Sequence, residues 1–85
     1  MTARYGLTGA VQTALLCQML GEMADRLEKN RPGQVMSALG RIGLIQATTM
    51  DPRLTPALKR LVPEIEGTVV RREFAVRLRE IAGAL

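Results

Sequence analysis

The stretch Ala10–Leu27, AVQTALLCQMLGEMADRL, decides the fold of this chain. Its apolar residues recur at spacings of three and four, which places them on faces of a helix. Two such faces lie side by side, one with large side chains and one with small side chains. The large-residue face holds Leu16, Leu20, Met23 and Leu27, and the small-residue face holds Ala10, Ala14, Cys17, Gly21 and Ala24. Two adjacent apolar faces predict a helix that packs against more than one neighbour.

Turn residues divide the rest of the chain into further helices. Pro32-Gly33 and Asp51-Pro52 are expected to interrupt helical geometry. Proline at the first helical position, followed by acidic residues, is typical of a helix start, and Pro63 with Glu64 and Glu66 fits this pattern. No stretch alternates with period two for long enough to predict a strand. The predicted helices are residues 9–29, 34–48, 55–61 and 63–82, the last starting at 68 if Gly67 interrupts it.

Composition indicates one small all-α domain, a bundle of three long helices and one short helix over residues 1–85. Residues 1–7 are expected to form a flexible tail. Chains of this size bury a marginal core and commonly need a disulfide, a metal or a second copy. A single cysteine excludes an intrachain disulfide. A metal site is poorly supported as well, because the chain has no histidine. We therefore expect a homodimer, with an idealised monomeric bundle as the alternative.

The first half of the first helix is the expected dimer interface, because Ala10–Leu20 is apolar nearly all round. The second predicted helix is expected to be the central buried element, since Arg41 is its only charged residue. Its Gly40 and Gly43 would allow close approach to the small-residue face. The predicted interface residues are Ala10, Val11, Ala14, Leu15, Cys17, Gly21 and Ala24.

Catalytic chemistry has little support in these residues. Cys17 and Ser37 are the candidate nucleophiles, but the chain contains no histidine to act as their base. One thiol without histidine cannot build a zinc site, and the acidic residues have basic neighbours or lie on different helix faces. We expect no catalytic residue, no metal site and no cofactor. Ala10–Leu20 is also too short to span a bilayer, which needs about 20 residues, so no membrane association is expected.

Nucleic-acid binding is the alternative function, because the formal net charge is +4. On the last helix the arginines alternate with Glu73 and Glu80, whereas a phosphate-binding stripe should be continuous. The chain has two aromatic residues, too few for a surface that stacks bases. A dimeric DNA- or RNA-binding regulator would use Arg53, Lys59, Arg60, Arg71, Arg72 and Arg79.

The sequence thus favours a non-catalytic protein-interaction module of bacterial or phage type, located in the cytoplasm, where a free thiol stays reduced. It would act as an inhibitor, adaptor or chaperone-like regulator that binds another protein through a helical surface. The outer face of the last helix, with Arg72, Arg77 and Arg79, would suit an acidic partner.

Overall fold

The computed structural model describes residues 9–85, and the predicted tail at residues 1–7 lies outside this range. These residues form four helices and two short strands, so the all-α prediction is confirmed in its broad form. The elements are α1 (Gly9–Lys29), β1 (Val35–Ser37), α2 (Ala38–Thr48), α3 (Thr55–Leu61), β2 (Thr68–Val70) and α4 (Arg71–Ala84). No helix within residues 9–85 is long and apolar enough to cross a membrane.

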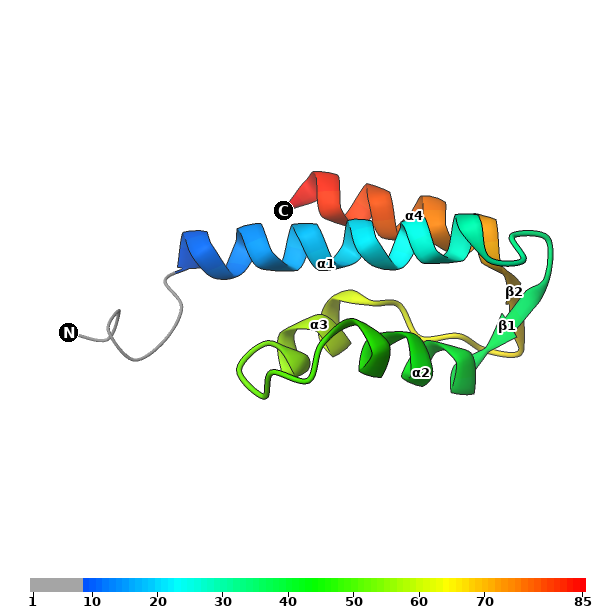
Figure 1. The fold of residues 1–85 in the computed structure, drawn as a ribbon, viewed down its shortest axis with the longest axis horizontal. Coiled ribbons are helices and arrows are strands. Elements are labelled where there is room, and N and C mark those ends of the chain that lie inside the picture. The colour runs from blue at the N-terminus through cyan, green and yellow to red at the C-terminus, as the bar shows by residue number, and fades with distance from the viewer. Residues whose placement is uncertain (1–8) are drawn as a thin grey trace.

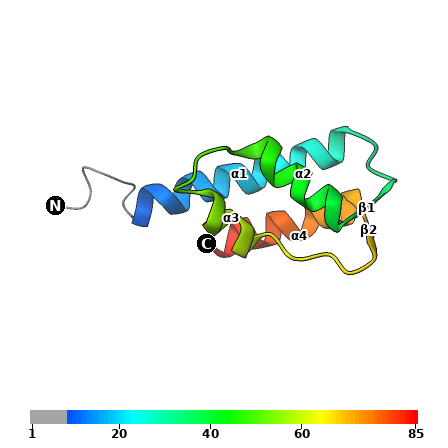
Figure 2. The same cartoon turned by 90° about the horizontal axis from the view of Figure 1, so that it is seen from below.

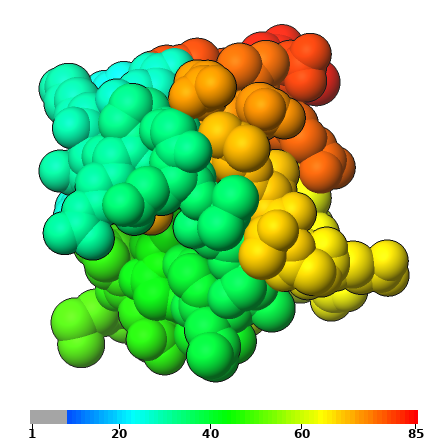
Figure 3. All heavy atoms as spheres, turned by 90° about the vertical axis from the view of Figure 1, so that its right-hand side faces the viewer, coloured from blue at the N-terminus to red at the C-terminus, as the bar shows by residue number. Residues whose placement is uncertain are grey.

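The elements form two layers joined at one end (Figures 1 and 2). In one layer α1 and α4 run antiparallel and make the most extensive contact between any two elements. The other layer contains α2 and α3. At the joined end β1 pairs with β2 in antiparallel register, Val35 with Val70, Met36 with Val69 and Ser37 with Thr68. Figure 3 shows this end, where the segment containing β1 lies directly against the segment containing β2.

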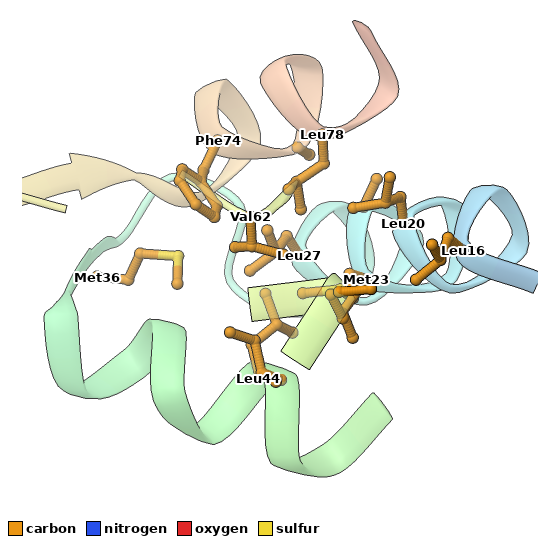
Figure 4. Close-up of a cluster of buried hydrophobic side chains, with 14 residues drawn as sticks. Leu16, Leu20, Met23, Leu27, Met36, Leu44, Val62, Phe74 and Leu78 are labelled. Carbon is orange, nitrogen blue, oxygen red and sulfur yellow. The ribbon is translucent and has the colours of Figure 1, made fainter. Parts of the chain in front are cut away.

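The core lies between the layers and is almost entirely aliphatic. Leu20, Met23 and Leu27 of α1 are fully buried, as are Phe74 and Leu78 of α4. Figure 4 shows that Met36, Leu44 and Val62 point into the same cluster from the opposite layer. The large-residue face of the first helix is therefore the main contribution of α1 to the core, as its spacing predicts.

The second predicted helix differs from the structure in three respects. It begins at Ala38 rather than at residue 34, because Val35–Ser37 pairs with a distant strand that satisfies its backbone groups. It is not the central buried element, since only Leu44 and Ile45 of α2 are buried. The prediction for its glycines is wrong as well. A Cβ at Gly40 would meet Met36 of the preceding strand, and one at Gly43 would meet nothing within 4 Å.

The last helix also starts later than either prediction, at Arg71. Pro63–Gly67 is an irregular segment that leads into β2, so Glu64 and Glu66 do not occupy the first turn of a helix. Gly67 has a φ of 69°, in the left-handed region that favours glycine, and it turns the chain into the strand. The strand then passes directly into α4, with Val70 in an extended conformation at the N-cap.

Truncation of a buried leucine should destabilise the protein far more than truncation of an exposed one. We expect Leu27→Ala to lower the free energy of unfolding by about 2–5 kcal/mol, because it leaves a cavity in the core. Leu39→Ala is the matched control, since Leu39 is 79% exposed, and we expect a change within about 0.5 kcal/mol. Urea unfolding followed by circular dichroism measures both. Equal losses would contradict the described core.

Alanine should have opposite effects at two exposed glycines. Gly67→Ala forces a side chain into the left-handed region and should cost about 1–2 kcal/mol of stability. Gly83→Ala lies in α4, where the added Cβ meets nothing within 4 Å, and should stabilise by about 0.5–1 kcal/mol. Thermal unfolding of the two variants checks the signs. A Gly67→Ala variant as stable as the natural chain would be inconsistent with this turn.

Candidate protein-docking surface

The outward face of α2 is apolar, exposed and uncharged. Leu39 is 79% exposed and Ile42 is 45% exposed, and Val35 in the preceding strand is 60% exposed. Gly43 and Gln46, which are also exposed, lie on the same side of the helix. Scattered apolar residues are normal on a protein surface, but a contiguous apolar patch marks an interaction site. We call Val35, Leu39, Ile42, Gly43 and Gln46 the α2 face.

A groove between α2 and α3 adjoins this face. One hollow of about 390 Å³ lies between Ile42 and Gln46 of α2 and Thr55 and Lys59 of α3. A second, more open hollow of about 410 Å³ shares Thr55 and Lys59 and continues to Met50, which is 92% exposed. No acidic residue lines either hollow. The groove therefore combines apolar side chains, among them Ile42, Ile45 and Met50, with uncharged polar groups and the cations Arg41 and Lys59.

Arg41 holds the two walls of the groove together. Its Nη2 donates hydrogen bonds to the carbonyl oxygens of Lys59 at 2.8 Å and Val62 at 2.9 Å. Its Nε donates to the carbonyl of Pro63 at 2.9 Å. These carbonyls lie at the C-terminal end of α3, where helical acceptors lack intrahelical partners and a cation is favourable. None of these acceptors is a carboxylate, so the positive charge of Arg41 is not neutralised.

The predicted dimer interface is divided between the core and the surface. Cys17 Sγ donates a hydrogen bond to the carbonyl of Ala82 in α4 at 3.4 Å, and Ala24 is fully buried. Ala24 therefore packs inside the chain, and the half-buried Cys17 contacts α4. Gly21 and Leu15 are half-buried. The start of α1 extends past the C-terminal end of α4 (Figures 1 and 2). The interface residues that are exposed are Ala10, Val11 and Ala14.

Arg79 connects α4 to α1 instead of pointing freely into solvent. Its Nη2 contacts Asp25 Oδ1 and Glu28 Oε1, each at 2.5 Å, and its Nε lies 3.3 Å from Glu28 Oε2. These hydrogen bonds lower the pKa of Asp25 and of Glu28 and raise the pKa of Arg79. Arg79 is one of the predicted partner-binding residues, but its guanidinium N–H groups already donate to two carboxylates of α1.

The other predicted basic residues fall into two groups. Arg53 Nη2 pairs with Asp51 Oδ2 at 2.8 Å, and Arg71 Nε donates to the carbonyl of Asn30 at 2.8 Å. The other predicted basic side chains form no hydrogen bond or ion pair within residues 9–85, namely those of Lys59, Arg60, Arg72 and Arg77. Some of the six residues predicted to bind nucleic acid therefore already bond to other groups of the chain. The six residues are also distributed over both layers.

The loop between α3 and α4 partly matches a calcium-binding loop of the EF-hand type. Such a loop has twelve residues, with oxygen ligands at positions 1, 3, 5 and 12 and glycine at position 6. Val62–Glu73 places glutamates at positions 3, 5 and 12 and Gly67 at position 6. Position 1 is Val62, which has no oxygen in its side chain and is 1% exposed. No three acidic or cysteine side chains in residues 9–85 converge on a common point, so this loop lacks the required ligand set.

The chain matches no known family model and shows no significant similarity to a curated protein or to a solved structure. Its function must therefore be argued from its own surfaces. Of the α2 face and the groove beside it, only Lys59 is among the binding residues predicted from the sequence, and there as part of the nucleic-acid alternative. Their sequence signal was the near absence of charge between Gln34 and Met50, which equally fits a buried helix and a docking helix.

The Arg79 cluster predicts a specific acid dependence of stability. The pKa of Asp25 and of Glu28 is lowered in the folded state. Their contribution is therefore complete above the ordinary carboxylate pKa of about 4 and is lost as the pH falls through the lowered values. We expect Arg79→Gln to reduce stability at pH 7, and this difference to vanish towards about pH 2. Arg77→Gln is the matched control and should show no such trend. Urea unfolding across this pH range measures it, and a difference that does not change with pH would contradict the pairing.

Proposed function

We propose that this protein is a non-catalytic interaction module that binds another protein through the α2 face and the adjoining groove. The single observation that carries the proposal is the exposure of Leu39 and Ile42 on a helix face without a charged residue. Covering apolar surface contributes about 25 cal/mol per Å², so a partner would gain from burying this face. The compartment that suits a free thiol such as Cys17 is the reducing cytoplasm.

We also propose that the module is a homodimer that associates through the first turns of α1. Support comes from Ala10 and Ala14, which are exposed small residues in the first half of α1. Small side chains there allow a second helix to approach closely. This arrangement leaves the α2 face, in the other layer, accessible to a different protein.

Light scattering during size-exclusion chromatography tests the dimer with two matched variants. We expect a dimer at low and high salt. Ala14→Glu should give a monomer, because it places a charge in the α1 contact, whereas Leu39→Glu should leave the dimer intact. A natural chain that is monomeric at both salts would overturn the dimer. A dimer lost only in Leu39→Glu would show that the α2 face binds a second copy and would overturn the docking proposal.

Site-specific photo-crosslinking tests the docking of another protein. A photo-reactive amino acid at position 39 should give a discrete adduct in cells of the source organism, and Ile42→Glu should remove it. Position 80 is the control, because Glu80 is exposed on α4 in the other layer, and it should not give this adduct. An identical adduct pattern from both positions, insensitive to Ile42→Glu, would contradict the proposal.

A further inference from the structure

We infer that the partner segment bound in the α2–α3 groove is an amphipathic helix with acidic residues along its polar flank. The inference rests on the proposed function, because it names the partner of the same surface. It follows from two independent properties of this surface, the spacing of its exposed residues and the charge of the groove.

The spacing of the exposed residues on the α2 face and at the edge of the groove suits a helix. The exposed residues Leu39, Ile42 and Gln46 recur at three and four and follow the axis of α2, which has 11 residues and is therefore roughly 16 Å long. A second helix laid beside α2 would bury apolar residues at i, i+3/i+4 and i+7 over about three turns. Met50, which follows the C-cap of α2, lines the second hollow, and its thioether can adjust to side chains of different shapes.

The charge of the groove specifies the partner's polar residues. Arg41 and Lys59 are the charged residues that line it, and both are cations. Arg41 donates to backbone carbonyls, and Lys59 has no side-chain partner within residues 9–85. The nearby acid Asp51 is already paired with Arg53 at 2.8 Å. Covering these cations costs free energy unless the partner supplies counter-charges. Carboxylates on the bound helix would supply them.

The same charges argue against a second copy of this chain as the occupant. A symmetric dimer through this groove would place equivalent patches against each other. Arg41 and Lys59 of one copy would then approach the same cations of the other copy, which is unfavourable. The clustered carboxylates of α1, Asp25 and Glu28, are already bound to Arg79. The apolar side chains in the groove, Ile42, Ile45 and Met50, likewise suit a peptide better than a nucleic-acid backbone.

The test is a displayed library of amphipathic helical peptides about four turns long. The apolar face is fixed as leucine, and the polar positions vary among Glu, Lys, Gln and Ser. Peptides are selected for binding to the full-length protein. Peptides that also bind the Ile42→Glu variant are discarded, because they bind outside the groove. We expect Glu to be enriched over Lys at the positions flanking the apolar face.

Affinity measurements on one selected peptide complete the test. Lys59→Glu should weaken binding about tenfold or more, and added salt should weaken binding to the natural chain. Arg77→Glu is the matched control, because it changes the net charge equally on an exposed residue of α4, outside the groove. It should change the affinity less than about twofold. Circular dichroism confirms that each variant is folded.

Each other outcome is decisive in a different way. Selected peptides without a charge bias, or rich in Lys, would overturn the inference and leave the proposed function intact. Failure to select any peptide that distinguishes the natural chain from Ile42→Glu would overturn the inference and also count against docking at this surface. If instead a duplex oligonucleotide binds and Lys59→Glu abolishes that binding, the cations serve phosphate and the inference is wrong.

Discussion

The antiparallel pairing of α1 with α4 is the contact on which the rest of this structure depends. It joins the two ends of the described chain through fully buried side chains, Leu20, Met23 and Leu27 from α1 and Phe74 and Leu78 from α4. One side of this pair must then be covered by the segment between them. The β1–β2 pairing determines where that segment leaves and rejoins the pair, and so directs α2 and α3 across the core.

This constraint explains why apolar side chains remain on the surface. A chain of 85 residues buries only about 60–65% of the surface that it exposes when unfolded. Leu44 and Ile45 bind α2 to the core, and within residues 9–85 no further layer covers its opposite side (Figure 1). Leu39 and Ile42 therefore face solvent although α2 carries almost no charge. We interpret this combination as the mark of a docking helix, since a helix without a partner would gain solubility from charged residues there.

Elements whose residues follow a single helical period could be predicted from the sequence. Elements that depend on contacts between distant segments could not. The core face of α1 was predicted correctly from the spacing of Leu16, Leu20, Met23 and Leu27. A spacing of three and four places these residues on one side of a single helix, so no distant contact is needed to predict it. The strands are three residues long, too short to show alternation, and each exists because of the other. The Pro63-Glu64 pattern resembles a helix start, yet strand pairing beyond Gly67 delays the helix to Arg71. The ion pairs of Arg79 link residues more than fifty positions apart, and no local pattern reveals them.

Methyl-detected NMR with a soluble paramagnetic probe tests the central claim most directly, because it reports which apolar side chains meet solvent in the purified protein. We expect strong relaxation enhancement for the methyl groups of Leu39, Ile42 and Met50, and little for those of Leu20 and Leu27. If the methyl groups of Leu39 and Ile42 are as protected as those of the core, this face is already covered. The α2 face would then be part of the protein's own packing or self-association, which would contradict its assignment as a surface for another protein.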